Sequence, residues 1–205
     1  MKTAILTALE ELDGELYEKF APVREKTPLH IIGGAALLLQ DTRKAMNGKV
    51  TDVDYLGREF DPQVKAVVDR VGMKHGLGRS FLCNELGSDA LEHLEYCVGR
   101  LTFVPFAAMK YFDVHVLCEK DILRLKVYAL DTCIMARRDD DVTEFERAQD
   151  YADIRDIAEK NGIAPCEIEE MTRDYVICQK EVYSSIADYM ANGRNRYVDD
   201  RLPPA

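Results

Sequence analysis

The chain has 205 residues, of which 47% are hydrophobic and 31% are charged, a composition typical of folded globular proteins and unlike that of disordered or fibrous chains. This length suits one domain with a helical extension better than two independent domains. The formal net charge of −10 disfavours nonspecific nucleic-acid binding, which needs clustered Lys and Arg, so any RNA partner would require a local basic patch.

No targeting or membrane segment is expected. The first apolar residues are followed at once by Glu10, Glu11 and Asp13, whereas a secretory signal would continue with an apolar stretch. No segment approaches the ~20 apolar residues of a spanning helix. We therefore expect a cytoplasmic protein without membrane association. The cysteines lie far apart without a C-x-x-C pair, and we interpret them as reduced and mostly buried.

The first predicted elements are a helix, a strand and a second helix. Apolar residues at three-four spacing predict an amphipathic helix over residues 3–20,. A short buried strand is predicted over 29–32, and it ends at Gly33 and Gly34,. The strong helix formers that follow predict a helix over 35–46,.

A second strand and a third helix come next. Asn47-Gly48 is a turn signal that leads into a predicted strand over 49–56,. Asp61 as N-cap and Pro62 at the first helical position predict a helix over 61–73,. A basic, glycine-containing loop is expected over 74–80.

Residues 81–118 are expected to complete the sheet. The stretches 81–86 and 89–98 are predicted as short helices, followed by strands over 101–106 and 111–117. In the last strand, alternate apolar residues indicate one buried face,.

The remainder is predicted to be helical. Helices are expected over 121–138, from the capping-box sequence at 143–146 to Asn161-Gly162, and from Pro165 to about Gly193,. Strands before residue 118 and helices after it predict an α+β protein, with a mixed sheet flanked by helices in 1–118 and a helical region over 119–205 that packs on it.

Two aspartates on the second strand carry the main chemical signal. Asp52 and Asp54 are two residues apart, so on a strand they project from the same face,. Neighbouring carboxylates repel unless a proton or cation lies between them. Such oxygen ligands suit Mg²⁺ or Mn²⁺, which take phosphate oxygens as further ligands. An isolated D-x-D is also compatible with a solvated strand end.

The glycine turn supplies the second part of the predicted site. Gly33 and Gly34 allow the backbone to approach a ligand, and the following helix start favours phosphate,. We therefore expect a metal-bound triphosphate between this turn and the two aspartates. Arg43 and Lys49 flank the site and are candidate triphosphate contacts, although each is also compatible with a surface charge.

The segments IIGGAALLL (31–39) and TDVDYL (51–56) resemble the motifs of the polymerase-β-like nucleotidyltransferase superfamily. Within it, the resemblance is closest to bacterial proteins of the AbiEii toxin type and their relatives. The resemblance implies a nucleotidyltransferase fold, with Lys126 reaching the phosphates and Asp153 supporting that lysine or orienting a base. It also implies a third carboxylate, for which Asp113 is the candidate. Gly34 departs from the serine found in many active members.

The function expected from these features is metal-dependent transfer of a nucleoside monophosphate from an NTP to tRNA, a protein or a small molecule. The alternative is a catalytically inactive relative that binds a nucleotide or a partner protein, such as one component of a toxin–antitoxin pair with a cognate antitoxin. A purely structural helical adaptor ranks below both, because a fold does not guarantee function.

Overall fold

The computed structural model describes residues 2–20, 25–42, 52–79, 81–84, 87, 89–136 and 144–193, with the backbone alone for 136 and 144–147. The described residues form two compact units. The first comprises residues 2–41 and 52–118, and the second comprises Thr42 and the helical part from Glu119 onward.

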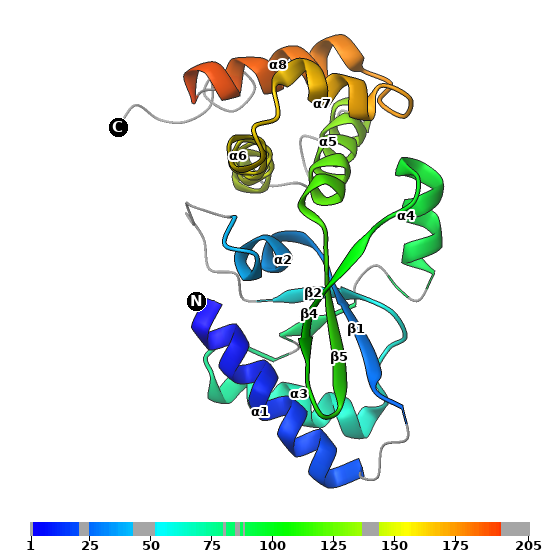
Figure 1. Cartoon of the computed structure of the whole chain (residues 1–205), viewed down its shortest axis with the longest axis vertical. Helices are drawn as coiled ribbons and strands as arrows, with labels where there is room; N and C mark the ends of the chain where they lie inside the picture. The colour runs from blue at the N-terminus through cyan, green and yellow to red at the C-terminus, as the bar shows by residue number, and fades with distance from the viewer. Residues whose placement is uncertain are drawn as a thin grey trace. The chain divides into compact units, whose positions relative to one another are not determined.

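A five-stranded mixed sheet forms the centre of the first unit (Figure 1). Its order is β3-β2-β1-β5-β4. β1 pairs in parallel with β5, as β2 does with β3, whereas the β1–β2 and β4–β5 pairs are antiparallel. The strands are β1 (Thr27–Ile31), β2 (Val53–Leu56), β3 (Leu82–Cys83), β4 (Phe103–Ala108) and β5 (Phe112–Leu117).

Alternation along the central strands separates a core face from a polar face. On β5, Phe112, Val114 and Val116 are buried, whereas Asp113 and His115 between them are only half-buried. Successive strand residues point to opposite faces, so the apolar set enters the core. Further core residues of the sheet are Leu29, Ile31, Val53 and Tyr55.

Two of the helices of the first unit pack against each other. α1 (Lys2–Phe20) and α3 (Pro62–Lys74) lie side by side (Figure 1). Their exposed edges carry ion pairs from Arg70 to Glu15 and from Lys74 to Glu11. The Asp61 side chain accepts hydrogen bonds from the first-turn N–H groups of α3, which confirms it as the N-cap,. The unit also contains α2 (Gly33–Leu39) and α4 (Ala90–Val98).

A buried aspartate ties α1 to the β4–β5 hairpin. Asp13 is 4% exposed, and its carboxylate accepts hydrogen bonds from the backbone N–H groups of Lys110, Tyr111 and Phe112 at 2.8, 2.8 and 2.9 Å. These donors compensate for the burial of the charge. Asp13 therefore fixes the hairpin turn on the helix.

The two outer strands are irregular. β3 has two residues. β4 contains Pro105 and a shift in register between Pro105 and Ala107. Proline lacks the N–H that a central strand would need, so its place on an edge strand is the expected one.

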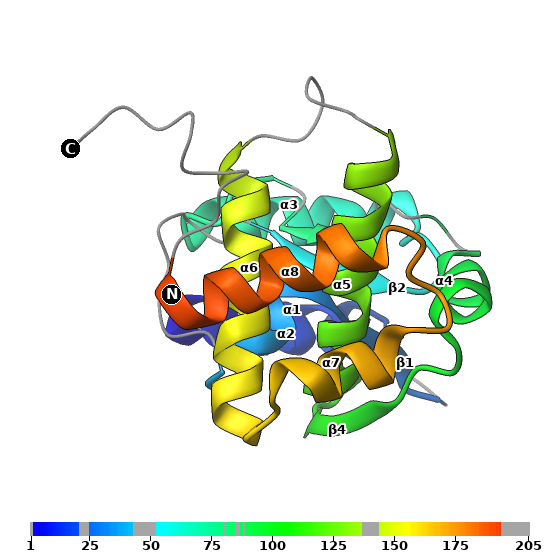
Figure 2. The ribbon, with the colours of Figure 1, turned by 90° about the horizontal axis from the view of Figure 1, so that it is seen from above.

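The second unit contains four described helices, α5 (Glu119–Ala136), α6 (Glu144–Asn161), α7 (Pro165–Thr172) and α8 (Gln179–Asn192). α8 crosses α5 and α6 and packs on both (Figure 2). Ile157, Ile168 and Val182 are fully buried in its core.

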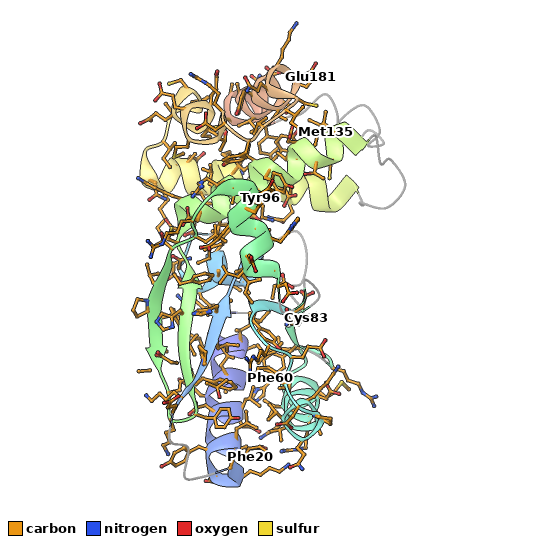
Figure 3. The ribbon with its side chains drawn as sticks, turned by 90° about the vertical axis from the view of Figure 1, so that its right-hand side faces the viewer. Phe20, Phe60, Cys83, Tyr96, Met135 and Glu181 are labelled. Atoms are coloured by element: carbon orange, nitrogen blue, oxygen red, sulfur yellow. The ribbon has the colours of Figure 1, made fainter. Side chains whose placement is uncertain are left out.

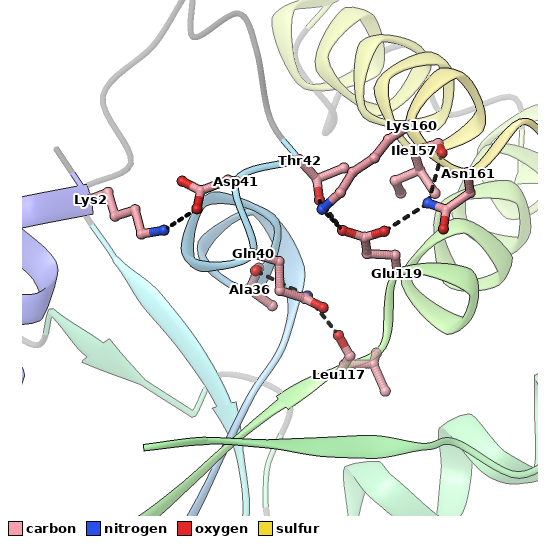
Figure 4. A network of polar contacts seen from close by, with 10 residues as sticks. All are labelled: Lys2, Ala36, Gln40, Asp41, Thr42, Leu117, Glu119, Ile157, Lys160 and Asn161. Atoms are coloured by element: carbon pink, nitrogen blue, oxygen red, sulfur yellow. Dashed lines mark hydrogen bonds and ion pairs between the residues drawn. The ribbon is translucent and has the colours of Figure 1, made fainter.

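A polar network holds the start of α5 (Figure 4). The Glu119 carboxylate accepts hydrogen bonds from Thr42 Oγ1 and Lys160 Nζ, and from Asn161 Nδ2 at 2.7 Å. Lys160 Nζ also donates to Thr42 Oγ1 at 2.9 Å. Burial acts to raise the pKa of Glu119, but the hydrogen bonds from Lys160, Thr42 and Asn161 outweigh it and lower that pKa,.

The predicted α+β class is confirmed, with a mixed sheet flanked by helices and a helical C-terminal part. Several details differ from expectation. Residues 81–86 were predicted as a helix, but Leu82–Cys83 is a strand. The helix predicted to reach Met46 ends at Leu39, and Asp41 follows with a φ of 58°. None of the described helices is long and apolar enough to cross a membrane.

A further difference concerns the helix predicted from Pro165 to Gly193, which is two helices. Between them, the N–H groups of Ile177 and Cys178 donate to the Asp131 carboxylate at 3.0 and 2.7 Å. These bonds replace the intrahelical bonds that a continuous helix would make. Residues 143 and 47–48, with their predicted cap and turn, lie outside the described residues.

Candidate functional site

The closest contact of the candidate site joins Gly33 to Asp54. Gly33 has a φ of 64°, a left-handed conformation that favours glycine. A Cβ atom at Gly33 would lie 3.1 Å from Asp54 Oδ2. The neighbouring Ile32 N–H donates to the Asp54 carbonyl oxygen at 2.9 Å. The turn and the second aspartate therefore meet at the end of β1, as the sequence predicts.

The two aspartates occupy adjoining but different positions. Asp54 is a half-buried residue of β2, and Asp52 is an exposed residue directly before that strand. On the neighbouring strand, Cys83 pairs with Asp54, so these two side chains project from the same face. A thiol therefore stands beside Asp54 on the neighbouring strand.

The donor set suits a magnesium ion that shares its ligands with a substrate. Within the described residues, no three His, Cys, Asp or Glu side chains are grouped to hold a metal ion. Mg²⁺ in phosphate-handling sites is commonly held by one or two carboxylates, with water and phosphate oxygens completing the octahedron. Asp52 and Asp54 fit that arrangement, and their joint binding of a metal stays a prediction.

Asp113, the candidate third carboxylate, is not brought to this end of the sheet. It pairs with Pro28 at the start of β1, whereas Ile32, which contacts Asp54, follows the end of that strand. Four residues of strand correspond to about 13 Å. Asp113 instead lies 4.0 Å from His115 Nδ1.

His115 belongs to a small aromatic group on the polar face of the sheet. The His30 ring lies 5.6 Å from that of His115 and 4.6 Å from that of Phe103, measured between centroids. Burial lowers the pKa of His30, and the neighbouring His115 lowers it further,. His30 itself is half-buried on this face.

The remaining predicted contacts of the first unit are only partly described. Gly34 follows Gly33 in the first turn of α2, a helix of seven residues. Such a short helix adds little dipole, so any phosphate contact depends on the glycine turn itself. Arg43 and Lys49 lie outside the described residues.

Lys126 and Asp153, which the resemblance pairs, do meet within the second unit. Lys126 Nζ lies 3.3 Å from Asp153 Oδ2 and forms a second ion pair with Asp150. Asp153 is fully buried and also accepts a hydrogen bond from Gln149 at 2.9 Å. Burial acts to lower the pKa of Lys126, but the two carboxylates outweigh it and raise that pKa. Two carboxylates around one ammonium leave a net negative charge, which does not attract phosphate. The phosphate-binding role of Lys126 stays a prediction.

A cavity beside β3 was missed by sequence reasoning. It has a volume of about 270 Å³ and is lined by Tyr55, Glu59, Phe60, Lys65, Val68, Leu82, Cys83 and Asn84. Asn84 Nδ2 donates to the Gly57 carbonyl oxygen at 2.8 Å, whereas its buried Oδ1 atom has no hydrogen-bond partner among the described residues. A buried acceptor in this state costs about 1–3 kcal/mol. No local motif marks Asn84, because its role depends on a residue 27 positions away.

Comparison with protein-family models, curated proteins and solved structures found no match to this chain. The functional proposal therefore rests on the geometry and chemistry of the residues described above.

Proposed function

We propose that the chain is a metal-dependent nucleotidyltransferase with a polymerase-β-like nucleotidyltransferase fold. The observation that carries the proposal is the contact between Gly33 and Asp54, in which a left-handed glycine lies against a carboxylate from the D-x-D segment. A glycine turn beside an acidic pair offers a triphosphate both backbone access and a shared cation. The motifs at 31–39 and 51–56 support the same assignment by resemblance.

Each part of this site has a separate task. Asp52 and Asp54 would hold Mg²⁺ or Mn²⁺. The bound ion would neutralise part of the negative charge of the phosphates. The Gly33 turn would let the backbone approach the phosphates next to Asp54. In the transfer, an acceptor hydroxyl oxygen bonds to the α-phosphorus while the bond to the pyrophosphate breaks. Pyrophosphate leaves with the electron pair, and the hydroxyl proton passes to water.

The acceptor is proposed to be a protein, a small molecule or tRNA. The net charge of −10 repels a polyanion unless basic residues cluster locally, so it favours the first two. We place the protein in the cytoplasm as part of the same proposal.

The test is a transfer assay with each of the four labelled NTPs and Mg²⁺ or Mn²⁺, against tRNA, small acceptors and the chain itself. We expect labelled product with the wild type and at least a hundredfold less with Asp52→Asn or Asp54→Asn, because the lost carboxylate carries metal binding. Asp69→Asn on α3 is the control for an unrelated change of charge. Equal product from the wild type and both variants would remove these aspartates from the reaction.

A second candidate function is nucleotide or partner binding without transfer, as in an inactive toxin–antitoxin component with a cognate antitoxin. The observation that favours it is the pairing of Cys83 with Asp54, together with the position of Asp113 at the other end of β1. Without a third acid, activation of the acceptor hydroxyl lacks a base. Thermal stabilisation by Mg²⁺ and NTP in the absence of any transfer would select this candidate.

A further inference from the structure

The cavity beside β3 is a second candidate site in the first unit. Phe60 and Cys83, both labelled in Figure 3, line it from a loop and a strand. Its volume of about 270 Å³ lies just below the ~300–1,000 Å³ of pockets for drug-sized ligands. The space therefore suits a single ring system.

Asn84 gives this cavity a directional polar group. Its Nδ2 atom is committed to the Gly57 carbonyl oxygen at 2.8 Å, so exchanging the amide nitrogen and oxygen would bring two oxygens together. The orientation is therefore fixed, and Oδ1 remains as a buried acceptor for which the described part of the chain provides no hydrogen-bond partner. Such an acceptor favours a ligand that presents an N–H or O–H group.

Aromatic side chains form another part of the cavity lining. The rings of Phe60 and Tyr55 are stacked, with centroids 4.9 Å apart and an interplanar angle of 23°. Burial raises the pKa of Tyr55, so its hydroxyl stays neutral at physiological pH. Flat aromatic surfaces of this kind favour a planar ligand.

The charged residues of the lining balance each other. Glu59 and Lys65 are both exposed and contribute opposite charges. The lining as a whole therefore gives no preference for a cation or an anion. A neutral ring with an N–H donor fits the aromatic walls, the fixed acceptor and the volume together.

We propose that this cavity binds an amino-bearing nucleobase, adenine or cytosine, whose exocyclic amino group donates a hydrogen bond to Asn84 Oδ1. Cys83 lines the cavity and pairs with Asp54 on the neighbouring strand, and Tyr55, the residue after Asp54 on β2, lines it as well. The inference rests on the proposed function in that the base would belong to the nucleotide whose phosphates meet Asp54.

The test uses nucleosides, because without phosphate or metal they do not depend on Asp52 and Asp54. Binding of adenosine, inosine, cytidine and uridine to the full chain is measured by ligand-observed NMR titration. Adenosine and inosine differ at the 6-position by an amino group in place of a carbonyl oxygen, and cytidine and uridine differ likewise at the 4-position. We expect the amino member of at least one pair to bind roughly tenfold more tightly, since at that position the carbonyl member places an acceptor oxygen, instead of a donor, against Asn84 Oδ1.

A substitution distinguishes the contribution of Asn84 to binding from that of the other cavity residues. Asn84→Leu should remove the preference within the pair, whereas Asn192→Leu on the exposed end of α8 should retain it. If Asn84→Leu fails to fold, the comparison of nucleoside binding to the wild type still decides whether the cavity prefers an amino group. Equal binding within both pairs, or no binding of any nucleoside, overturns the inference.

The outcomes also separate this inference from the proposed function. Nucleotidyl transfer without discrimination between the nucleosides would overturn the base site alone. Discriminating nucleoside binding without transfer from any NTP would overturn the catalytic proposal and leave the base site standing.

Discussion

Gly33 and Asp54 are so close that a side chain at the glycine would press on the carboxylate, with a Cβ atom 3.1 Å from Asp54 Oδ2. Gly33→Ala should therefore destabilise the fold by at least about 1–2 kcal/mol, because its φ of 64° is also unfavourable for alanine,. It should in addition weaken any stabilisation by Mg²⁺ and NTP, since the carboxylate must shift. Denaturant unfolding and thermal shift measure the two effects.

Gly34→Ala is the matched control, because Gly34 is not among the glycines with positive φ. An equal loss of stability in both variants would show that the left-handed turn and the carboxylate contact do not set the requirement at Gly33.

Gly72 should tolerate no side chain, although it lies within a helix. A Cβ atom there would lie 2.2 Å from the Gly78 carbonyl oxygen and 2.7 Å from Phe81 Cδ1. We expect Gly72→Ala to destabilise by about 1–3 kcal/mol through overpacking. Gly14 in α1 has no atom within 4 Å of the same position, so Gly14→Ala should stabilise by about 0.5–1 kcal/mol. Urea unfolding of both variants checks the predicted difference in sign.

Asp13→Asn should loosen the β4–β5 hairpin. The aspartate accepts hydrogen bonds from three backbone N–H groups, and an asparagine amide would turn one acceptor into a donor that faces them. We expect a loss of about 1–3 kcal/mol in the free energy of unfolding. Amide hydrogen exchange at Lys110, Tyr111 and Phe112 should accelerate. The exposed Glu10→Gln in the same helix should change neither quantity, and unaltered exchange in Asp13→Asn would contradict the anchoring role.

Lys126→Met should destabilise the second unit by about 3–5 kcal/mol, because it leaves the fully buried Asp153 carboxylate and the partly exposed Asp150 carboxylate without their cation,. Adding Asp150→Asn should recover part of that loss by removing one of the repelling charges. The exposed Lys180→Met serves as the control. A fully stable Lys126→Met protein would show that the ion pairs do not hold the helices together.

The stability of the second unit should fall in acid through Glu119. Its pKa is lowered from the usual value of 4.5, so its contribution is present above pH 4.5 and is lost as the pH falls through the lowered value. Glu119→Gln should therefore show a smaller loss of unfolding free energy between pH 6 and pH 3 than the wild type. Glu181→Gln, at an exposed residue of α8, should keep the wild-type slope. Parallel slopes for all three proteins would argue against this role of Glu119.

Elements whose signals are local could be predicted from the sequence. The apolar spacing of α1, the Asp61 cap of α3 and the alternation in β5 each lie within one segment, and the structure confirms them. The short strand β3 could not be predicted, because its two residues become a strand only by pairing with β2. The break between α7 and α8 depends on Asp131, more than forty residues upstream.

The candidate site divides in the same way. Gly33 and Asp54 carry recognisable chemistry, so their proximity could be predicted from a turn and a strand. Asn84 could not be found from its own segment, because its nitrogen is bound by the distant Gly57 carbonyl oxygen, which leaves its Oδ1 atom without a partner in the described ranges. The position of Asp113 could not be predicted either, because it is set by the register between β1 and β5, which the residue types do not reveal.

The irregular edges of the sheet bear on aggregation at high protein concentration. A strand from another molecule can add to a sheet only where a long row of backbone donors and acceptors is open. β3 provides two residues and β4 is interrupted at Pro105. In the described residues, neither border of the sheet offers such a row, which disfavours growth into ordered aggregates through these two strands.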